Sequence, residues 1–185
     1  RPCRHRDPQD RRPADPLQRL STLDEGCASR LGAPIPLTSD RDPKMAHILL
    51  CCSASVSVYK ACDLASKLAQ NGHQVRTAMT ENAARLVSPQ LFHAVTGEAA
   101  QVSEWGDERR GAMDHIELSR SVDLVIVAPC SADLAGRLAH GMANDLVTTT
   151  LLAVPAGVPR LVCPAMNPHM LANPAVQRNL DALRA

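Results

Sequence analysis

The sequence has few of the features that mark metal-binding, nucleic-acid-binding or membrane proteins. Its seven cysteines include no CxxC pair, which argues against a zinc site. The formal net charge is +1, which gives no electrostatic case for binding nucleic acid or an anionic membrane. The apolar run at residues 124–129 is among the longest, yet it is far too short to span a bilayer. The sequence therefore predicts no nucleic-acid partner and no membrane association.

Aromatic side chains are scarce as well, since Tyr59, Phe92 and Trp105 are the only ones. The core must therefore consist of Val, Leu, Ile, Ala and Met side chains. The first residues carry charges but no apolar stretch, so no signal peptide is visible. The last five cysteines lie in or beside apolar segments, where a free cysteine behaves as a small hydrophobic residue. Their odd total and irregular spacing indicate reduced thiols in a cytoplasmic protein.

Residues 1–44 differ in composition from the rest of the chain. They hold seven of the fourteen prolines and nine of the twenty Lys and Arg residues, without sustained periodicity. Such a segment cannot bury enough apolar surface to offset its ordering entropy, so we expect it to be a disordered extension. The first clear strand opens at Met45, which is a candidate for the natural start, with a genuine Pro-rich tail as the alternative. One folded domain is expected over residues 45–185.

From Met45 onward, apolar runs typical of strands alternate with amphipathic segments typical of helices. Strands are expected over residues 47–52, 74–79, 123–128 and 160–163, and helices over 57–71, 82–87, 89–95, 132–140, 144–153 and 174–184. This alternation predicts an α/β fold with a parallel sheet covered by helices on both faces. Ligands of such folds bind outside the carboxyl ends of the strands, and the polar motifs of this sequence follow strands.

Hydroxyl side chains follow three of the expected strands. Ser53 and Ser55 lie after the first strand, Thr80 after the second and Ser131 after the third. Small hydroxyl residues at a helix N-terminus allow the backbone to approach a phosphate. The same residue types are also common helix N-caps, and both interpretations fit each motif when it is taken alone.

Two further motifs suit a substrate carboxylate. His115 belongs to a His-Ile-x-Leu motif, and histidine is suited to acid–base work or to holding a carboxylate, although a lone histidine is more often structural. Pro164 and Pro168 bracket Asn167, which fixes its amide in one place as an uncharged donor. An ordinary Asn-Pro turn explains the same pattern. Asn144 and Asp145 are expected to cap the helix that follows them.

The order of these motifs resembles a known family. Met-Thr-x-Asn-Ala, His-Ile-x-Leu, Ala-Pro-x-Ser-Ala, His-Gly-x-Ala-x-Asp-Leu and Pro-x-Met-Asn-x-x-Met occur over residues 45–180. This series resembles the homo-oligomeric flavin-containing cysteine decarboxylases, and most closely those that act on phosphopantothenoylcysteine in coenzyme A synthesis. The resemblance implies a three-layer flavodoxin-like or Rossmann-like fold. It also implies FMN bound at a subunit interface of a homo-oligomer, either a trimer or a dodecamer.

The resemblance assigns Ser53, Ser55 and Ser131 to FMN contacts, with Thr80 as a further contact. It implies that FMN accepts a hydride from the cysteine side chain of the substrate and so forms a thioaldehyde. The thiocarbonyl then absorbs the electrons released as carbon dioxide leaves, which gives an enethiol. In coenzyme A synthesis the enethiol is reduced by the flavin to 4′-phosphopantetheine.

The resemblance also assigns the substrate residues. His115 matches the active-site histidine and would assist proton transfer or substrate positioning. Asn167 and Met170 match residues that bind and orient the substrate, with Asn167 on the carboxylate. The implied enzyme is a carboxy-lyase whose partner is a small cysteine-containing molecule.

The sequence departs from the family pattern at several positions. Ala54 replaces the usual Gly, Leu171 replaces Trp, and Asp133 replaces Asn and so could place a negative charge near the flavin. The family also carries a later flap with a proton-donating cysteine, whereas no cysteine follows Cys163 here. The expected flavoprotein domain over residues 45–185 is therefore truncated at its C-terminus, or it has lost the reductive step. An oxidative decarboxylase of a peptide C-terminal cysteine and a non-catalytic flavin-binding regulatory subunit are the alternatives.

Overall fold

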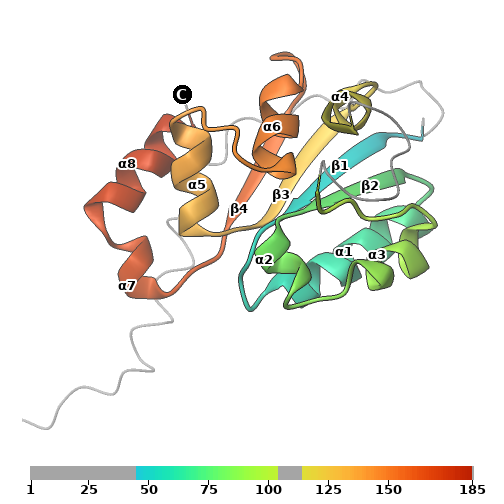
Figure 1. The fold of residues 1–185 in the computed structure, drawn as a ribbon, viewed down its shortest axis with the longest axis horizontal. Coiled ribbons are helices and arrows are strands. Elements are labelled where there is room, and N and C mark those ends of the chain that lie inside the picture. Colours follow the sequence, from blue (N-terminus) through green and yellow to red (C-terminus); the bar gives the residue numbers. More distant parts are fainter. Residues whose placement is uncertain (1–44, 104–113, 185) are drawn as a thin grey trace, which may run out of the picture. The chain divides into compact units, whose positions relative to one another are not determined.

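Four parallel strands form one sheet in the order β2-β1-β3-β4 (Figure 1). The computed structural model describes residues 45–103 and 114–184, so the extension predicted over residues 1–44 lies outside the described residues. The strands are β1 (His47–Cys52), β2 (Gln74–Met79), β3 (Leu124–Cys130) and β4 (Arg160–Pro164). The chain leaves β1 toward β2 on one side and continues with β3 and β4 on the other. This order puts a topological switch point between β1 and β3, where α/β proteins bind ligands.

Helices cover both faces of the sheet, which confirms the predicted three-layer, flavodoxin-like fold (Figure 1). Helices α1 (Val58–Gln70), α2 (Glu81–Ala84) and α3 (Pro89–Thr96) lie on one side. Helices α4 (Asp114–Ser119), α5 (Ala132–Ala139) and α6 (Leu146–Ala153) lie on the other. Helices α7 (Pro168–Leu171) and α8 (Pro174–Ala182) follow β4, and α8 packs against α5.

The two halves of the core follow from the alternation of side chains along the central strands. Ile48, Leu50 and Cys52 of β1 face α1 and α3, where Phe92 is buried. Leu49 and Cys51 face the opposite way, toward a cluster built with α5, α6 and α8. Burial on both faces is what a near-continuous apolar strand predicts.

The observed elements follow the predicted ones closely. The bounds of β1 and β2 match the prediction, and the other predicted elements are shifted by one to three residues. Two helices were not predicted as such: α4, in place of a short turn after His115, and α7, in place of an Asn-Pro turn. Within the described ranges, every helix is too short or too polar to traverse a bilayer.

Candidate functional site

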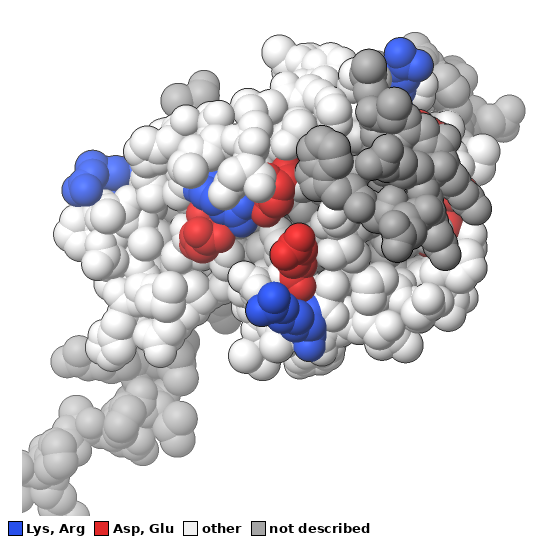
Figure 2. Space-filling view, in the orientation of Figure 1, with Lys and Arg blue, Asp and Glu red and all other residues white. Residues whose placement is uncertain are grey.

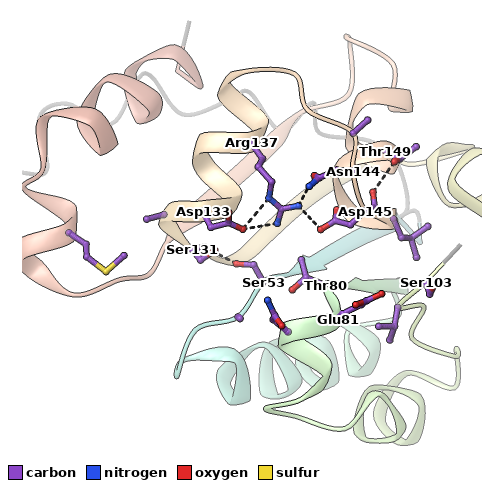
Figure 3. Close-up of a pocket in the computed structure, with 17 residues that line it drawn as sticks. Ser53, Thr80, Glu81, Ser103, Ser131, Asp133, Arg137, Asn144, Asp145 and Thr149 are labelled. Atoms are coloured by element: carbon purple, nitrogen blue, oxygen red, sulfur yellow. Dashed lines mark hydrogen bonds and ion pairs between the residues drawn. The ribbon is translucent and has the colours of Figure 1, made fainter.

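A cavity of about 770 Å³ opens where β1, β2 and β3 end. Its volume lies within the range of roughly 300–1,000 Å³ that is common for small-molecule and cofactor sites. Figure 2 shows acidic and basic side chains gathered in the middle of one face of the molecule, and Figure 3 shows the lining of the cavity. The lining residues are Ser53, Ala54, Thr80, Glu81, Asn82, Val102, Ser103, Ser131, Ala132, Asp133, Arg137, Ala143, Asn144, Asp145, Leu146, Thr149 and Met170.

Ser53 joins the ends of the two central strands. Its buried hydroxyl donates to the Pro129 carbonyl at 2.8 Å and accepts from the Ser131 amide at 2.7 Å. The hydroxyl hydrogen is thus already engaged, which leaves one lone pair for a ligand. Ser53 reaches the cavity as predicted, and its first effect there is to fix the loop that carries Ser131.

Ser131 begins helix α5 at the edge of the cavity. Its side chain accepts from the Leu134 amide at 3.2 Å, which confirms the predicted N-cap. Ala132 also lines the cavity. The first amides of a helix have no acceptor within it, and the helix dipole adds partial positive charge at this end. This edge of the cavity is therefore suited to an anion.

Thr80 and Met170 also line the cavity, and their assigned contacts with FMN and substrate remain predictions. The buried side chain of Thr80 accepts from the Ala83 amide at 3.2 Å and caps α2. Met170 comes from α7, beyond the edge strand, and is about half exposed. Hydroxyl groups that follow three strands and the Met170 side chain thus face the same space.

Three predicted site residues lie outside the lining of the cavity. The Ser55 and Ser57 hydroxyls bond to each other at 3.2 Å. The side-chain oxygen of Asn167 accepts from the His169 amide at 2.8 Å, which caps α7 and leaves the side-chain NH₂ group to donate. His115 is half-buried in the first turn of α4. The roles assigned to Ser55, Asn167 and His115 remain predictions.

An ion-pair cluster on one wall of the cavity was missed by the sequence prediction (Figure 3). Arg137 of α5 pairs with Asp133 at 2.9 Å and with Asp145 at 2.5 Å. It also donates to the Asn144 side-chain oxygen at 3.1 Å. The i,i+4 spacing of Asp133 and Arg137 on an expected helix was a usable signal. The contact of Arg137 with Asp145 could not be predicted from the sequence, because it depends on how two separate helices pack.

Asp145 is the predicted N-cap of α6, and the structure confirms that role. One carboxylate oxygen accepts from the Thr148 amide at 2.8 Å and from the Thr148 hydroxyl at 2.7 Å. The other oxygen binds Arg137. Burial raises the pKa of Asp145, but the hydrogen bonds from Arg137 and Thr148 outweigh it, so the pKa lies below its ordinary value. The carboxylate is therefore ionised at neutral pH.

Arg137 keeps its charge in this setting. Burial lowers its pKa, but the hydrogen bond and the charge of Asp145, together with Asp133, outweigh burial and raise the pKa. The Arg137 side chain is 13% exposed, against 74% for Asp133 and 23% for Asp145. The cluster therefore consists of one largely buried cation, one partly buried anion and one exposed anion.

The thiols beneath the cavity are not nucleophiles. Burial raises the pKa of Cys52 and of Cys130 to about 12. The Cys52 thiol donates to the Ala128 carbonyl at 3.3 Å. The five cysteines of the described ranges are free. These two side chains act as small apolar residues, because the thiolate is the reactive form.

Residues 36–185 match the family model described as Flavoprotein. The coenzyme A biosynthesis bifunctional protein CoaBC of Bacillus subtilis (strain 168) is 44% identical over 137 residues, which are 74% of this chain and 33% of that protein. The CoaBC protein of Escherichia coli (strain K12) is 45% identical over 136 residues, again 33% of its length. The chain thus spans about a third of these curated relatives.

A shorter relative and two solved structures match over most of their lengths. A protein of Streptococcus mutans, described as a probable phosphopantothenoylcysteine decarboxylase, is 35% identical over 74% of this chain and 76% of its own. The FMN-dependent cysteine decarboxylase SpaF has a TM-score of 0.69 at 35% identity, covering 75% of this chain and 79% of its own. A PPC decarboxylase mutant complexed with pantothenoylaminoethenethiol has a TM-score of 0.67 at 27% identity, covering 76% and 78%.

Proposed function

The chain belongs to the Flavoprotein family, and from that premise we propose that it binds FMN and decarboxylates phosphopantothenoylcysteine to 4′-phosphopantetheine. One observation carries the proposal. The aligned region is a third of the bifunctional coenzyme A proteins but three quarters of the Streptococcus mutans protein described as a probable phosphopantothenoylcysteine decarboxylase. We therefore assign the decarboxylase activity to the segment that this chain shares with both kinds of protein.

The lining of the cavity fits FMN in size and in chemistry. About 770 Å³ is ample for one flavin nucleotide and part of a substrate. The Ser53–Ala54 segment, Thr80 and the α5 N-terminus at Ser131 and Ala132 offer hydroxyl and amide groups for a phosphate and for polar ring atoms. We propose these residues as the FMN contacts within one chain. Bound FMN would supply an acceptor for the hydride of the cysteine side chain and would return that hydride to the enethiol left after carbon dioxide departs, which gives 4′-phosphopantetheine.

The substrate residues are proposed from the sequence motifs. In the cap of α7 the side-chain oxygen of Asn167 accepts from the His169 backbone amide, which leaves the side-chain NH₂ group to donate to the substrate carboxylate. An uncharged donor orients a carboxylate without stabilising it so strongly that its loss becomes harder. His115 would hold or move a proton near the sulfur, and Met170 would pack against the substrate chain.

His115, Asn167 and Ser55 lie outside the lining of this chain's own cavity. We propose that they meet the cavity of a neighbouring subunit in a trimer or a dodecamer. A subunit-interface site explains why one chain carries only part of the predicted set in one place. Large apolar side chains exposed on this chain, among them Tyr59 and Leu161, support association.

The test measures carbon dioxide release by the FMN-loaded protein. Phosphopantothenoylcysteine is supplied as one substrate, and a short peptide ending in cysteine as the other. We expect kcat/KM for phosphopantothenoylcysteine to be at least about a hundredfold higher than for the peptide, because the peptide would leave polar groups of the site unpaired. Binding of FMN without release from either substrate would contradict the proposed enzyme and favour a regulatory subunit.

A peptide decarboxylase is the second candidate. Two solved structures carry descriptions without a phosphopantothenoyl group, which leaves room for another cysteine substrate: SpaF at 35% identity, and TvaF from thioviridamide biosynthesis at 32% identity with a TM-score of 0.69. Both are described as FMN-dependent cysteine decarboxylases. A preference for the cysteine-ending peptide in the same assay would replace the first proposal with this one.

His115→Asn tests the histidine. We expect the variant to bind FMN with unchanged affinity and to lose at least about a hundredfold in kcat, because the amide cannot transfer a proton. His93→Asn, on α3 and outside the lining of the cavity, is the matched control and should keep wild-type kcat. Full activity of His115→Asn would contradict the assigned role.

A further inference from the structure

The charge of the cavity is at odds with an anionic ligand. Carboxylates of Glu81, Asp133 and Asp145 line it, and among the described lining residues Arg137 is the one cation. FMN carries a phosphate with nearly two negative charges at neutral pH, so carboxylates without a counter-charge would oppose its binding. This argument rests on the proposed binding of FMN.

The geometry of Arg137 answers that conflict. Its guanidinium lies between the carboxylates of Asp133 and Asp145 and bonds to both, as Figure 3 shows. The planar group also donates to Asn144, so its position is set by three acceptors from two segments. Since the side chain is only 13% exposed, water screens its charge less than it screens a surface pair.

Arg137 is not required for the cap of α6. The Asp145 oxygen that caps the helix accepts from Thr148, whereas the other oxygen meets Arg137. Loss of Arg137 would therefore leave the helix start bonded and leave two carboxylates without a counter-charge. The main consequence of its removal is electrostatic.

We propose that Arg137 is the positioning residue that allows this cavity to accept an anionic flavin, by pairing with the Asp133 and Asp145 carboxylates and holding the Asn144 segment against α5. It acts through these side chains and need not touch the flavin. Arg137 thereby determines the preference of the site for FMN over the uncharged riboflavin.

The test compares the dissociation constants of FMN and riboflavin, measured by fluorescence titration of the apoprotein. Arg137→Met keeps length and helix propensity but removes the charge. We expect FMN binding to weaken at least about tenfold and riboflavin binding to change less than about threefold, because the phosphate meets uncompensated carboxylates. Lys67→Met removes a cation from an exposed i,i+4 pair with Asp63 on α1, and it should leave both constants unchanged.

A charge-rescue variant separates electrostatics from folding. Asp133→Asn combined with Arg137→Met should recover most of the lost FMN affinity, because one of the two stranded carboxylates is gone. Should Arg137→Met fail to fold, Asp133→Asn and Glu81→Gln test the proposal from the other side, and each should tighten FMN relative to riboflavin. Equal losses for both flavins, no rescue, or no tightening in these single variants would overturn the role of Arg137.

The two proposals fail in distinguishable ways. A wild-type protein that binds neither flavin overturns the proposed function together with the role of Arg137. A wild-type protein that binds FMN while Arg137→Met keeps the same preference for FMN overturns the role of Arg137 alone. Bound FMN without turnover of either cysteine substrate overturns the proposed enzyme and leaves the measured charge effect standing.

Discussion

Ser53 and Asp145 show how single side chains join segments that are far apart in the fold. Ser53 connects the end of β1 with the end of β3, and Asp145 connects the start of α6 with α5. The sequence predicted that Ser53 reaches the site and that Asp145 caps a helix. It could not predict their second partners, because Pro129 lies 76 residues from Ser53 and Arg137 lies on a separate helix.

Ser53→Ala tests the connection between the strand ends. The variant leaves the Ser131 amide without its acceptor, so we expect the free energy of unfolding to fall by about 1–3 kcal/mol. FMN affinity should fall with it, because Ser131 and the start of α5 lose their support. Urea denaturation measures the first effect, and Ser66→Ala, whose hydroxyl meets only the Gln70 side chain on α1, should stay within about 0.5 kcal/mol of wild type. Wild-type stability of Ser53→Ala would contradict the account.

Asp145 predicts a direction of pH dependence. Its pKa is lower in the folded protein than in the unfolded chain, because hydrogen bonds from Arg137 and Thr148 outweigh burial. It therefore adds stability above its unfolded pKa, and that stability is lost as the pH falls through the folded pKa. Asp145→Asn should lower stability at neutral pH and reduce its loss between neutral pH and about pH 3.

The control for that titration is Asp63→Asn, which removes an exposed carboxylate paired with Lys67. An exposed pair contributes little, so this variant should keep the wild-type dependence on pH. Guanidinium chloride would mask charge effects, so unfolding by urea at each pH is the suitable measurement. An Asp145→Asn protein with the full wild-type loss in acid would refute the assignment.

At the scale of elements, hydrophobic periodicity was sufficient for the sheet and for most helices. β1 and β2 were predicted to the residue, because β1 is an apolar run that ends at small polar residues and β2 follows the Asn71-Gly72 end of a helix. α7 has only four residues, and its sequence Pro-His-Met-Leu carries no helical period. Its start is fixed instead by the Asn167 cap. In the sequence, the same Asn-Pro pattern is equally typical of a turn.

Two neighbouring residues of helix α3 test which face of the helix packs against the sheet. Phe92 is 0% exposed beneath the sheet, whereas the adjacent Leu91 is 52% exposed. Phe92→Ala should cost about 3–5 kcal/mol of unfolding free energy, because it empties a large volume in a core with few aromatic residues. Leu91→Ala on the same helix should cost less than about 0.5 kcal/mol. Similar losses in the two variants would show that α3 packs through another face.

At the scale of the whole molecule, the sheet order explains why motifs spread over 118 residues, from Ser53 to Met170, reach one cavity. The carboxyl ends of β1, β2 and β3 share one edge, so the loops that follow them converge there. The sequence could predict that convergence from the alternation of strands and helices. It could not predict the ion-pair cluster, nor which residues of the motif series lie outside one chain's cavity.

Assembly is the prediction that belongs to this scale. Large apolar side chains stay exposed on several elements, including Tyr59 on α1, Leu152 on α6 and Leu161 on β4. We expect light scattering to give a mass of three or twelve times the 19.9 kDa chain. Leu161→Asp should lower that mass by placing a charge on the exposed edge strand, while Gln90→Asp, at an exposed polar position of α3, serves as the control. A monomer at micromolar concentration would contradict the subunit-interface site.

The central claim is that this chain uses FMN to oxidise and decarboxylate phosphopantothenoylcysteine. The most direct measurement is the visible absorption spectrum of the FMN-loaded protein, recorded without oxygen before and after the substrate is added. We expect the flavin absorption to bleach as the substrate is oxidised, carbon dioxide to appear with it, and the absorption to return as the reduced flavin gives its hydride back to the enethiol. An unchanged flavin spectrum and no carbon dioxide, from protein shown to contain FMN, would contradict it.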